Sequence, residues 1–177
     1  AVVAVACKHL NRVDGMTIRL YIAGPMTGIP FFNRHAFKLA AEKLLNLGYD
    51  VISPVDRLGG DIAEIERTSV DGDASVLTID QQIAIVRQNT EDVISADGLA
   101  VLDGWWQSKG TRHEITLANR LGKPVRAIET WYWFSGDQKR LSTVPMPNDP
   151  VVIPGYWPKL DPVNDDEIDY MRDPDGR

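Results

Sequence analysis

Short apolar runs alternate along the chain with longer segments in which apolar residues recur every three to four positions. Four runs have the length of buried strands, at 18–23, 49–52, 98–102 and 124–128. The segments between them predict amphipathic helices over about 33–48, 78–93 and 111–121. Strands that alternate with helices are typical of a parallel sheet. We therefore predict an α/β fold with a single domain, a Rossmann-like (flavodoxin-like) parallel sheet of four to five strands flanked by helices.

Residues suited to capping stand at the start of each predicted helix. Asn33 is a favourable N-cap, and Thr78 with Gln81 has the spacing of a capping box. The helix that begins there should turn four apolar residues toward the core: Ile79, Ile83, Val86 and Val93. Thr111 and Glu114 repeat the capping-box spacing, so the simplest role of Glu114 is to cap its own helix.

The segment at 54–77 is polar and rich in turn formers, including Gly59-Gly60 and Asp71-Gly72-Asp73. Connections of this length in a compact domain are usually functional or mobile. We interpret its acidic residues as a solvated lid rather than a cation site: Asp56, Asp61, Glu64, Asp71 and Asp73.

Two segments flank the alternating pattern. Residues 1–15 precede Met16 and a strand-like run, and are interpreted as an upstream extension or cloning remnant. The folded domain is expected at 16–130. Residues 131–177 are first aromatic and then rich in proline and aspartate, which predicts a C-terminal arm that packs on another subunit.

The charge and cysteine content narrow the range of functions. A formal net charge of -6 disfavours binding to a nucleic acid polymer, which needs clustered Lys and Arg. Cys7 is the single cysteine, so no intrachain disulfide can form, and a cytoplasmic location is expected. No apolar stretch approaches the roughly 20 residues that span a bilayer. We expect a small-molecule ligand and no membrane partner.

Cofactor motifs are missing from the sequence. No G-x-G-x-x-G or P-loop pattern follows the first predicted strand. His35 and His113 have no His or Cys partner at metal-ligand spacing. We therefore expect neither a cofactor nor a metal.

Ligands of open parallel sheets bind beyond the carboxyl ends of the strands. Three segments follow strands here, at 24–32, 54–77 and 103–114. The last contains Glu114, which acquires a second possible role beside capping. A carboxylate in the first helical turn is kept ionised by the helix dipole and faces the strand-end crevice. An ionised carboxylate is also the nucleophile that retaining glycosidases use at an anomeric carbon.

Several motifs resemble the nucleoside 2-deoxyribosyltransferase superfamily in their order and spacing. They are Tyr21-Ile22-Ala23-Gly24-Pro25, Ala96-Asp97, and Ser108-x-Gly110-x-x-x-Glu114 followed by Ala118, Gly122 and Pro124. The form Gly24-Pro25-Met26-Thr27-Gly28 with Gly104-Trp105-x-x-Ser108-x-Gly110 most resembles a branch often found in phages. The resemblance covers about 17–128 and implies that 16–130 is a catalytic domain. It also implies that Glu114 is the nucleophile and that Tyr21 helps to position it.

Ser108 refines this resemblance. Family members that act on free nucleosides tend to carry an acid six residues before the nucleophile. The deoxynucleoside 5′-monophosphate N-hydrolases resemble this chain in carrying serine there. A hydroxyl donates to a phosphate oxygen that a carboxylate would repel, and Lys109 with the helix N-terminus adds positive potential. The alternative is an ordinary Ser-x-Gly turn.

One position departs from the family pattern. Eight residues before Asp97, where the family usually has an aspartate that handles the leaving base or sugar, this chain has Asn89. Asparagine has no acidic proton to supply. Asp92 lies nearly one helical turn later and would replace that aspartate in a shifted register; otherwise it is a solvated helix carboxylate.

Aromatic residues complete the candidate site. Phe31, Phe32, Trp105 and Trp106 would either stack on a base, at a gain of ~1–3 kcal/mol each, or pack in the core. The predicted catalytic residues are Glu114, Tyr21, Asn89 and Asp92. The predicted substrate-binding residues are Gly24, Pro25, Met26, Gly28, Phe31, Asp103, Trp105, Ser108, Lys109 and Gly110.

Three functions follow from these residues and the resemblance. The leading hypothesis is hydrolysis of the base–sugar bond of a 2′-deoxynucleoside 5′-monophosphate through a glycosyl-enzyme on Glu114. The same site becomes a deoxyribosyltransferase if a second base captures that intermediate before water does. A nucleotide-binding or sensing module without turnover is the third, and Asn89 motivates it. Related folds complete their sites across a dimer interface, so the resemblance also implies a homodimer or higher homo-oligomer.

Overall fold

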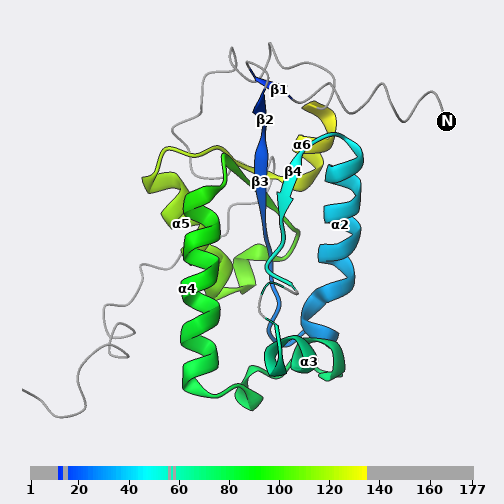
Figure 1. Ribbon diagram of the computed structural model, residues 1–177, viewed down its shortest axis with the longest axis vertical. Helices are drawn as coiled ribbons and strands as arrows, with labels where there is room; N and C mark the ends of the chain where they lie inside the picture. Colours follow the sequence, from blue (N-terminus) through cyan, green and yellow to red (C-terminus); the bar gives the residue numbers. More distant parts are fainter. Residues whose placement is uncertain (1–11, 14–15, 56, 58, 135–177) are drawn as a thin grey trace, which may run out of the picture.

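The computed structural model describes residues 12–13, 16–55, 57 and 59–134 (Figure 1). Its main sheet has four parallel strands: β3 (Arg19–Ala23), β4 (Asp50–Ile52), β5 (Gly98–Val101) and β6 (Val125–Ala127). Helices α2 (Arg34–Asn46) and α6 (Ile128–Phe134) pack on one face, and α4 (Ile79–Ser95) and α5 (Lys109–Arg120) pack on the other. The predicted α/β fold, with helices flanking a parallel sheet, is confirmed.

The core lies in two layers, one on each face of the sheet. Because side chains alternate along a strand, β3 supplies both layers. Leu20 and Ile22 face α2 and join a cluster with Phe37, Leu44 and Trp131. Tyr21 and Ala23 face the other way and join a cluster with Val93, Leu99, Val101, Ile115 and Ala118. The central strand is therefore buried on both faces, as expected for a parallel sheet.

The strand order creates a crevice at one end of the sheet. In the order β4-β3-β5-β6, the chain runs from β3 to β4 on one side and then crosses to β5 on the other. The segments after β3 and β5 therefore diverge, and such a switch point is where ligands bind in open α/β sheets. The two strand ends themselves lie close together, and Gly24 permits this because a Cβ there would lie 2.9 Å from the Cβ of Leu102.

The segment at 54–77 contains regular structure that its composition did not predict. Helix α3 (Asp61–Thr68) and the 3-10 helix η2 (Ala74–Val76) lie within it. Its backbone is joined to the loop after β3, since Gly28 N donates to Gly72 O at 2.9 Å and Phe31 N donates to Ser69 O at 2.8 Å. Gly72 has φ 68°, and a Cβ there would lie 2.0 Å from the carbonyl oxygen of Ile29. Only glycine fits this junction.

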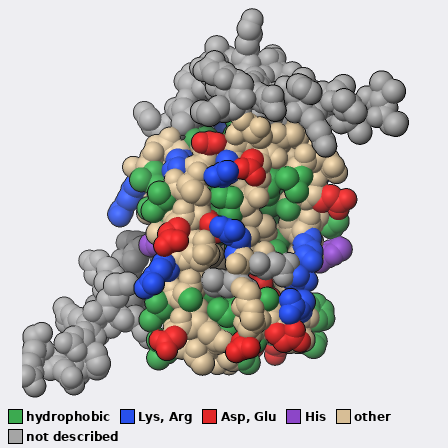
Figure 2. All heavy atoms as spheres, in the orientation of Figure 1, with side chains coloured by type: hydrophobic (Ala, Val, Ile, Leu, Met, Phe, Trp, Pro, Cys, Tyr) green, Lys and Arg blue, Asp and Glu red, His purple; other side chains and the backbone are tan. Residues whose placement is uncertain are grey.

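The acidic residues of the same segment lie on the surface. The four that the structure describes are exposed: Asp61, Glu64, Asp71 and Asp73. Asp56 lies outside the described residues. On the face drawn in Figure 2, acidic and basic side chains are interspersed.

The first half of α4 does not pack on the sheet as predicted. The capping box of Thr78 and Gln81 is present, so the helix begins where expected. However, Ile79, Ile83 and Val86 are 75%, 50% and 59% exposed, and only Val93 of the predicted inner face is buried. The reason is geometric, because the first turns of α4 run beyond the strands (Figure 1). Periodicity places an apolar stripe on a helix but does not say how far the partner sheet extends.

Helix α6 crosses the domain boundary predicted at 130. Trp131 is 1% exposed, packs edge-on against Tyr49, and donates from its indole nitrogen to Leu99 O at 2.9 Å. The domain therefore continues to Phe134, and the rest of the predicted C-terminal arm, 135–177, lies outside the described residues. At the other end, β1 (Arg12–Val13) pairs with β2 (Met16–Thr17), so β1 belongs to the predicted extension 1–15.

Candidate active site

A pocket of about 780 Å³ opens at the carboxyl ends of β3 and β5. Residues from 24–33, 54–77 and 103–114 line it, together with one side of α4. These are the segments that follow strands β3, β4 and β5, so the switch point of the sheet and the pocket coincide.

The structure brings most of the predicted site residues to this pocket, and the following line it: Gly24, Pro25, Met26, Gly28, Asn89, Asp103, Ser108, Lys109, Gly110 and Glu114. Four predicted residues do not line it: Tyr21, Phe31, Asp92 and Trp105. Of these four, Tyr21 still takes part in the site, because it lies directly behind Glu114.

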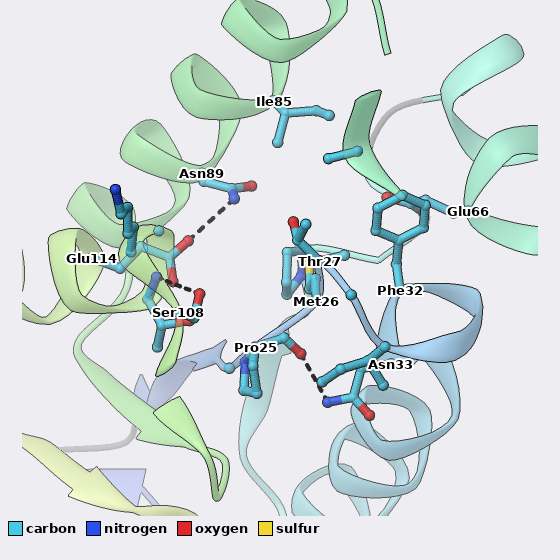
Figure 3. Close-up of a pocket in the computed structure, with 18 of the residues that line it drawn as sticks. Pro25, Met26, Thr27, Phe32, Asn33, Glu66, Ile85, Asn89, Ser108 and Glu114 are labelled. Atoms are coloured by element: carbon cyan, nitrogen blue, oxygen red, sulfur yellow. Dashed lines mark hydrogen bonds between the residues drawn. The ribbon is translucent and has the colours of Figure 1, made fainter. Parts of the chain in front are cut away.

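Glu114 is held by two hydrogen bonds to a single oxygen. The hydroxyl of Tyr21, on β3, donates to Glu114 Oε1 at 2.8 Å. The side-chain amide of Asn89, on α4, donates to the same oxygen at 3.2 Å (Figure 3). No other described residue donates to this carboxylate, which leaves Oε2 without a hydrogen bond from the described protein. One oxygen therefore fixes the side chain while the other remains open to a ligand.

The start of α5 differs from the prediction. The helix begins at Lys109, and Ser108 is its N-cap, with Oγ accepting from Thr111 N at 3.2 Å. Glu114 is therefore in the second turn and not in a capping box with Thr111. The two spacings look alike in sequence, because Ser108 lies three residues before Thr111 just as Thr111 lies three before Glu114. Glu114 has no capping role to explain its presence.

Burial controls the ionisation of Glu114. Loss of solvent raises its pKa from 4.5 to about 7, although the hydrogen bonds from Tyr21 and Asn89 each favour the charged form. The expectation that the helix dipole keeps this carboxylate fully ionised is therefore wrong, since the dipole acts mainly in the first turn. The pKa of Tyr21 is raised well above its usual value, chiefly by burial and then by the charge of Glu114. The phenol therefore stays neutral and donates a hydrogen bond to the carboxylate.

Asp92 is not placed at the pocket. Its carboxylate is 3% exposed and accepts from Arg57 at Nε (3.0 Å) and at an Nη nitrogen (2.7 Å), in a paired geometry typical of arginine and carboxylate. Gln88 donates to it as well, at 3.1 Å. Its oxygens are thus occupied by a structural ion pair, which orients Arg57 on the pocket wall. The interpretation of Asp92 as a substitute acid or a solvated side chain does not fit this placement.

A left-handed turn places Phe32 in the pocket lining in place of Phe31, which was the predicted substrate-binding residue. Three consecutive residues, Phe31, Phe32 and Asn33, have φ of 53°, 51° and 58°, a region that costs non-glycine residues energy. The turn exposes Phe31 to 44% and sends Phe32 into the pocket lining. Asn33 occupies the predicted N-cap position of α2, but its side chain does not bond to the helix and instead donates from its amide to Pro25 O at 2.9 Å (Figure 3). Strain in this segment therefore shapes the pocket wall.

Trp105 is core rather than pocket. It is 6% exposed and packs with Tyr21, Leu99 and Ile115 in the layer beneath α5, with Trp106 edge-on beside it. The packing role, one of the two alternatives for this residue, is the one that the structure shows. The aromatic ring that lines the pocket is that of Phe32 instead.

Helix α3 contributes residues that were absent from the predicted site. Ile62, Ile65 and Glu66 line the pocket from this helix, and Arg57 lines it from the segment before. The available signal was the spacing i, i+3, i+4 of those three residues, which places them on one helical face. However, α3 has only eight residues and is flanked by glycines and polar turns. A segment this short does not show a helical period in the sequence alone.

Neither a metal site nor a membrane segment is visible in the described part of the chain. Over those residues, no three His, Cys, Asp or Glu side chains converge as metal ligands. Likewise, none of the helices described has the length and apolar character needed to cross a bilayer.

Fold and pocket together define an α/β protein with a half-buried, hydrogen-bonded carboxylate at the switch point of a parallel sheet. The family model described as "Domain of unknown function (DUF4406)" matches residues 18–127, and the chain belongs to this family. None of the curated proteins compared with the chain matches it.

Two solved structures are similar to this chain. A conserved protein from Enterococcus faecalis V583 is 25% identical with a TM-score of 0.46, and the match covers 63% of each chain. A 2-deoxyribosyltransferase from Bacillus psychrosaccharolyticus is 20% identical with a TM-score of 0.42, over 62% of this chain and 70% of that one. The chain thus spans less than two thirds of the first of these proteins.

Proposed function

We propose that this protein is an N-glycosidase that hydrolyses the base–sugar bond of a 2′-deoxynucleoside 5′-monophosphate, with Glu114 as nucleophile. The observation that carries the proposal is the placement of Glu114. It lies in the pocket at the switch point, has Oε1 fixed by Tyr21 and Asn89, and has Oε2 open. A fixed carboxylate with one open oxygen suits attack on an anomeric carbon.

The reaction takes place in two displacements. Glu114 Oε2 forms a bond to C1′ while the C1′–N bond breaks, and the electron pair of that bond leaves with the base, which takes a proton from water. Water then attacks C1′ of the glycosyl-enzyme, gives up a proton, and releases Glu114 and the 5-phosphorylated deoxyribose. Two displacements at the same carbon retain its configuration, as in retaining glycosidases.

The protein supplies little help to the departing base. Asn89 has no acidic proton, and Asp92 is bound to Arg57. Protonation of the base by pocket water is therefore part of the proposal.

The phosphate would lie at the start of α5. Ser108 Oγ accepts from Thr111 N, so the hydroxyl hydrogen remains available for donation to a phosphate oxygen. Lys109, Gly110 and the N-terminus of this 12-residue helix line the same part of the pocket. Figure 3 shows Ser108 beside Glu114, so a phosphate bound here would be near the reacting carbon.

The direct test is release of free base. Purified protein is incubated with each 2′-deoxynucleoside 5′-monophosphate and the products are separated by chromatography. Free base together with deoxyribose 5-phosphate supports the proposal. Transfer to a second, added base would instead support a deoxyribosyltransferase, which the apolar wall of Ile62, Ile65 and Ile85 favours by limiting water. Binding without release from any substrate would leave a nucleotide-binding module.

Ser108→Ala is expected to weaken use of a 5′-monophosphate more than use of the matching nucleoside. Loss of one hydrogen bond to a charged group costs about 1.5–3 kcal/mol in kcat/KM. The measurement is the ratio of the two efficiencies in each protein. Ser108→Asp is the matched variant, because aspartate still caps the helix but repels phosphate, so its ratio should fall further. An unchanged ratio in both variants would remove Ser108 from the phosphate site.

The rate should depend on pH through Glu114. Because burial raises the pKa of Glu114 to about 7 and only the ionised form attacks, kcat/KM should rise along an ascending limb centred near that pH. The profile is measured with a monophosphate and with its nucleoside, since the phosphate itself ionises at about pH 6. The limb should appear with both substrates. A limb near 4.5 with the nucleoside would contradict the raised pKa.

A further inference from the structure

The pocket has two chemically different ends. The end at α5 is polar, with Ser108, Lys109 and the helix N-terminus. The other end lies between α3, η1 (Pro30–Asn33) and α4, and its lining is largely apolar: Phe32, Ile62, Ile65, Ala74, Leu77, Ile85 and Val86. A flat heterocyclic base suits the apolar end, as a phosphate suits the polar end.

One carboxylate stands in this apolar wall. Glu66, on α3, lines the pocket and is 8% exposed. Figure 3 shows it beside Phe32, across the pocket from Glu114. Acidic residues are rarely buried to this extent unless their oxygens accept hydrogen bonds. A carboxylate has about four acceptor positions, so it can serve a protein partner and a ligand together.

We propose that Glu66 selects the base, with its two oxygens accepting the N1–H and N2–H groups of guanine, and that 2′-deoxyguanosine 5′-monophosphate is the preferred substrate. This inference rests on the proposed glycosidase function and assigns its substrate. It adds Glu66 to the site as a residue that determines specificity.

The hydrogen-bond pattern of the bases supports guanine. An ionised carboxylate only accepts, so its best partner is an edge with two neighbouring donors. The Watson–Crick edge of guanine has that pair. Adenine and cytosine each place a ring-nitrogen acceptor beside their amino group, and thymine places its N–H between two carbonyl oxygens. These three edges would direct at least one acceptor at Glu66, an arrangement that is repulsive.

The test compares two substrates that differ by one amino group. Hypoxanthine keeps the N1–H of guanine but lacks the N2 amino group. An equimolar mixture of 2′-deoxyguanosine and 2′-deoxyinosine 5′-monophosphates is given to the full-length protein, and the rates of guanine and hypoxanthine release give the ratio of kcat/KM. Loss of one hydrogen bond to a charged group predicts a preference for guanine of about 10- to 100-fold. Because both substrates share one tube, the ratio does not depend on the folded fraction of the protein.

Glu66→Gln should reduce this preference to about threefold or less, because a glutamine amide accepts with one group and donates with the other. Glu64→Gln is the matched control. Glu64 lies on the same helix, pairs with Arg67 at the surface and does not line the pocket, so this variant should keep the wild-type ratio. A merely structural role of Glu66 would lower both rates together and leave their ratio unchanged.

Binding measurements separate this inference from the proposed function. Dissociation constants for both nucleotides are measured by calorimetry in the Glu114→Gln protein, with and without Glu66→Gln. Base release without a preference for guanine, or with a preference that Glu66→Gln leaves intact, overturns the role of Glu66 and leaves the glycosidase standing. If the wild-type protein releases no base but the Glu114→Gln protein binds the guanine nucleotide more tightly in a way that depends on Glu66, the glycosidase is overturned and recognition of guanine is supported. No release and no difference in binding overturns both.

Discussion

Glu114→Gln is expected to lower base release from a 2′-deoxynucleoside 5′-monophosphate by about 10³-fold or more while the protein stays folded. The amide oxygen of glutamine can still accept from Tyr21 and Asn89, so the local structure is kept. The variant lacks the anionic oxygen that attacks C1′, and loss of an enzymatic nucleophile commonly costs several orders of magnitude. The measurement is chromatography of free base over a long incubation.

The same variant should be more stable than the wild type above neutral pH. A pKa raised from 4.5 to about 7 means that folding disfavours the charged carboxylate. The stability associated with the protonated group is complete below pH 4.5 and is lost as the pH rises through about 7. At pH 8 the loss is about 3 kcal/mol, and the uncharged glutamine avoids it. Urea unfolding at pH 4.5 and pH 8 should therefore show a gain at the higher pH alone.

Glu91→Gln is the control for both measurements, because Glu91 is exposed on α4 and does not line the pocket. It should keep the wild-type rate and show no comparable gain at pH 8. Turnover close to wild type in a folded Glu114→Gln protein would leave this glutamate a structural role only.

Asn89→Asp is expected to accelerate cleavage by about 10²- to 10⁴-fold, the usual contribution of a positioned general acid. The amide nitrogen of Asn89 lies 3.2 Å from Glu114 Oε1, so an aspartate there would share a proton with Glu114. In the singly protonated pair, one carboxylate can attack while the other protonates the base. The pH–rate profile should therefore change from a single ascending limb to a bell shape, because the rate falls again when the pair of carboxylates loses its last proton.

Gln82→Glu is the matched control for this charge, because Gln82 also lies on α4 and lines the pocket, two turns before Asn89. It adds the same charge without touching Glu114, so the single ascending limb should persist. A profile of unchanged shape in Asn89→Asp would show that position 89 has no influence on the ionisation of Glu114. If Asn89→Asp cleaves more slowly and has a bell-shaped pH profile, the shared proton rests on the nucleophile and protonation of the base does not limit the rate.

The sequence by itself determined the elements and the edge of the sheet where the pocket lies. The apolar runs and capping residues depend on local chemistry, so β3, β5, α2 and the start of α4 lie close to where the pattern predicts them. Glu114 could be singled out because its position after a strand and the spacing of its neighbours are both visible in the chain.

Tertiary structure decided the rest, because those features depend on residues far apart in the sequence. The pKa of Glu114 follows from burial and from Tyr21, which lies 93 positions earlier. The pairing of Asp92 with Arg57 removes a candidate acid that sequence spacing alone left open. Glu66 reached the pocket only because α3 is tied across the loop after β3. Local periodicity determines which side of a helix is apolar. Tertiary packing determines which element that side contacts and whether a charged residue on the helix is exposed to solvent.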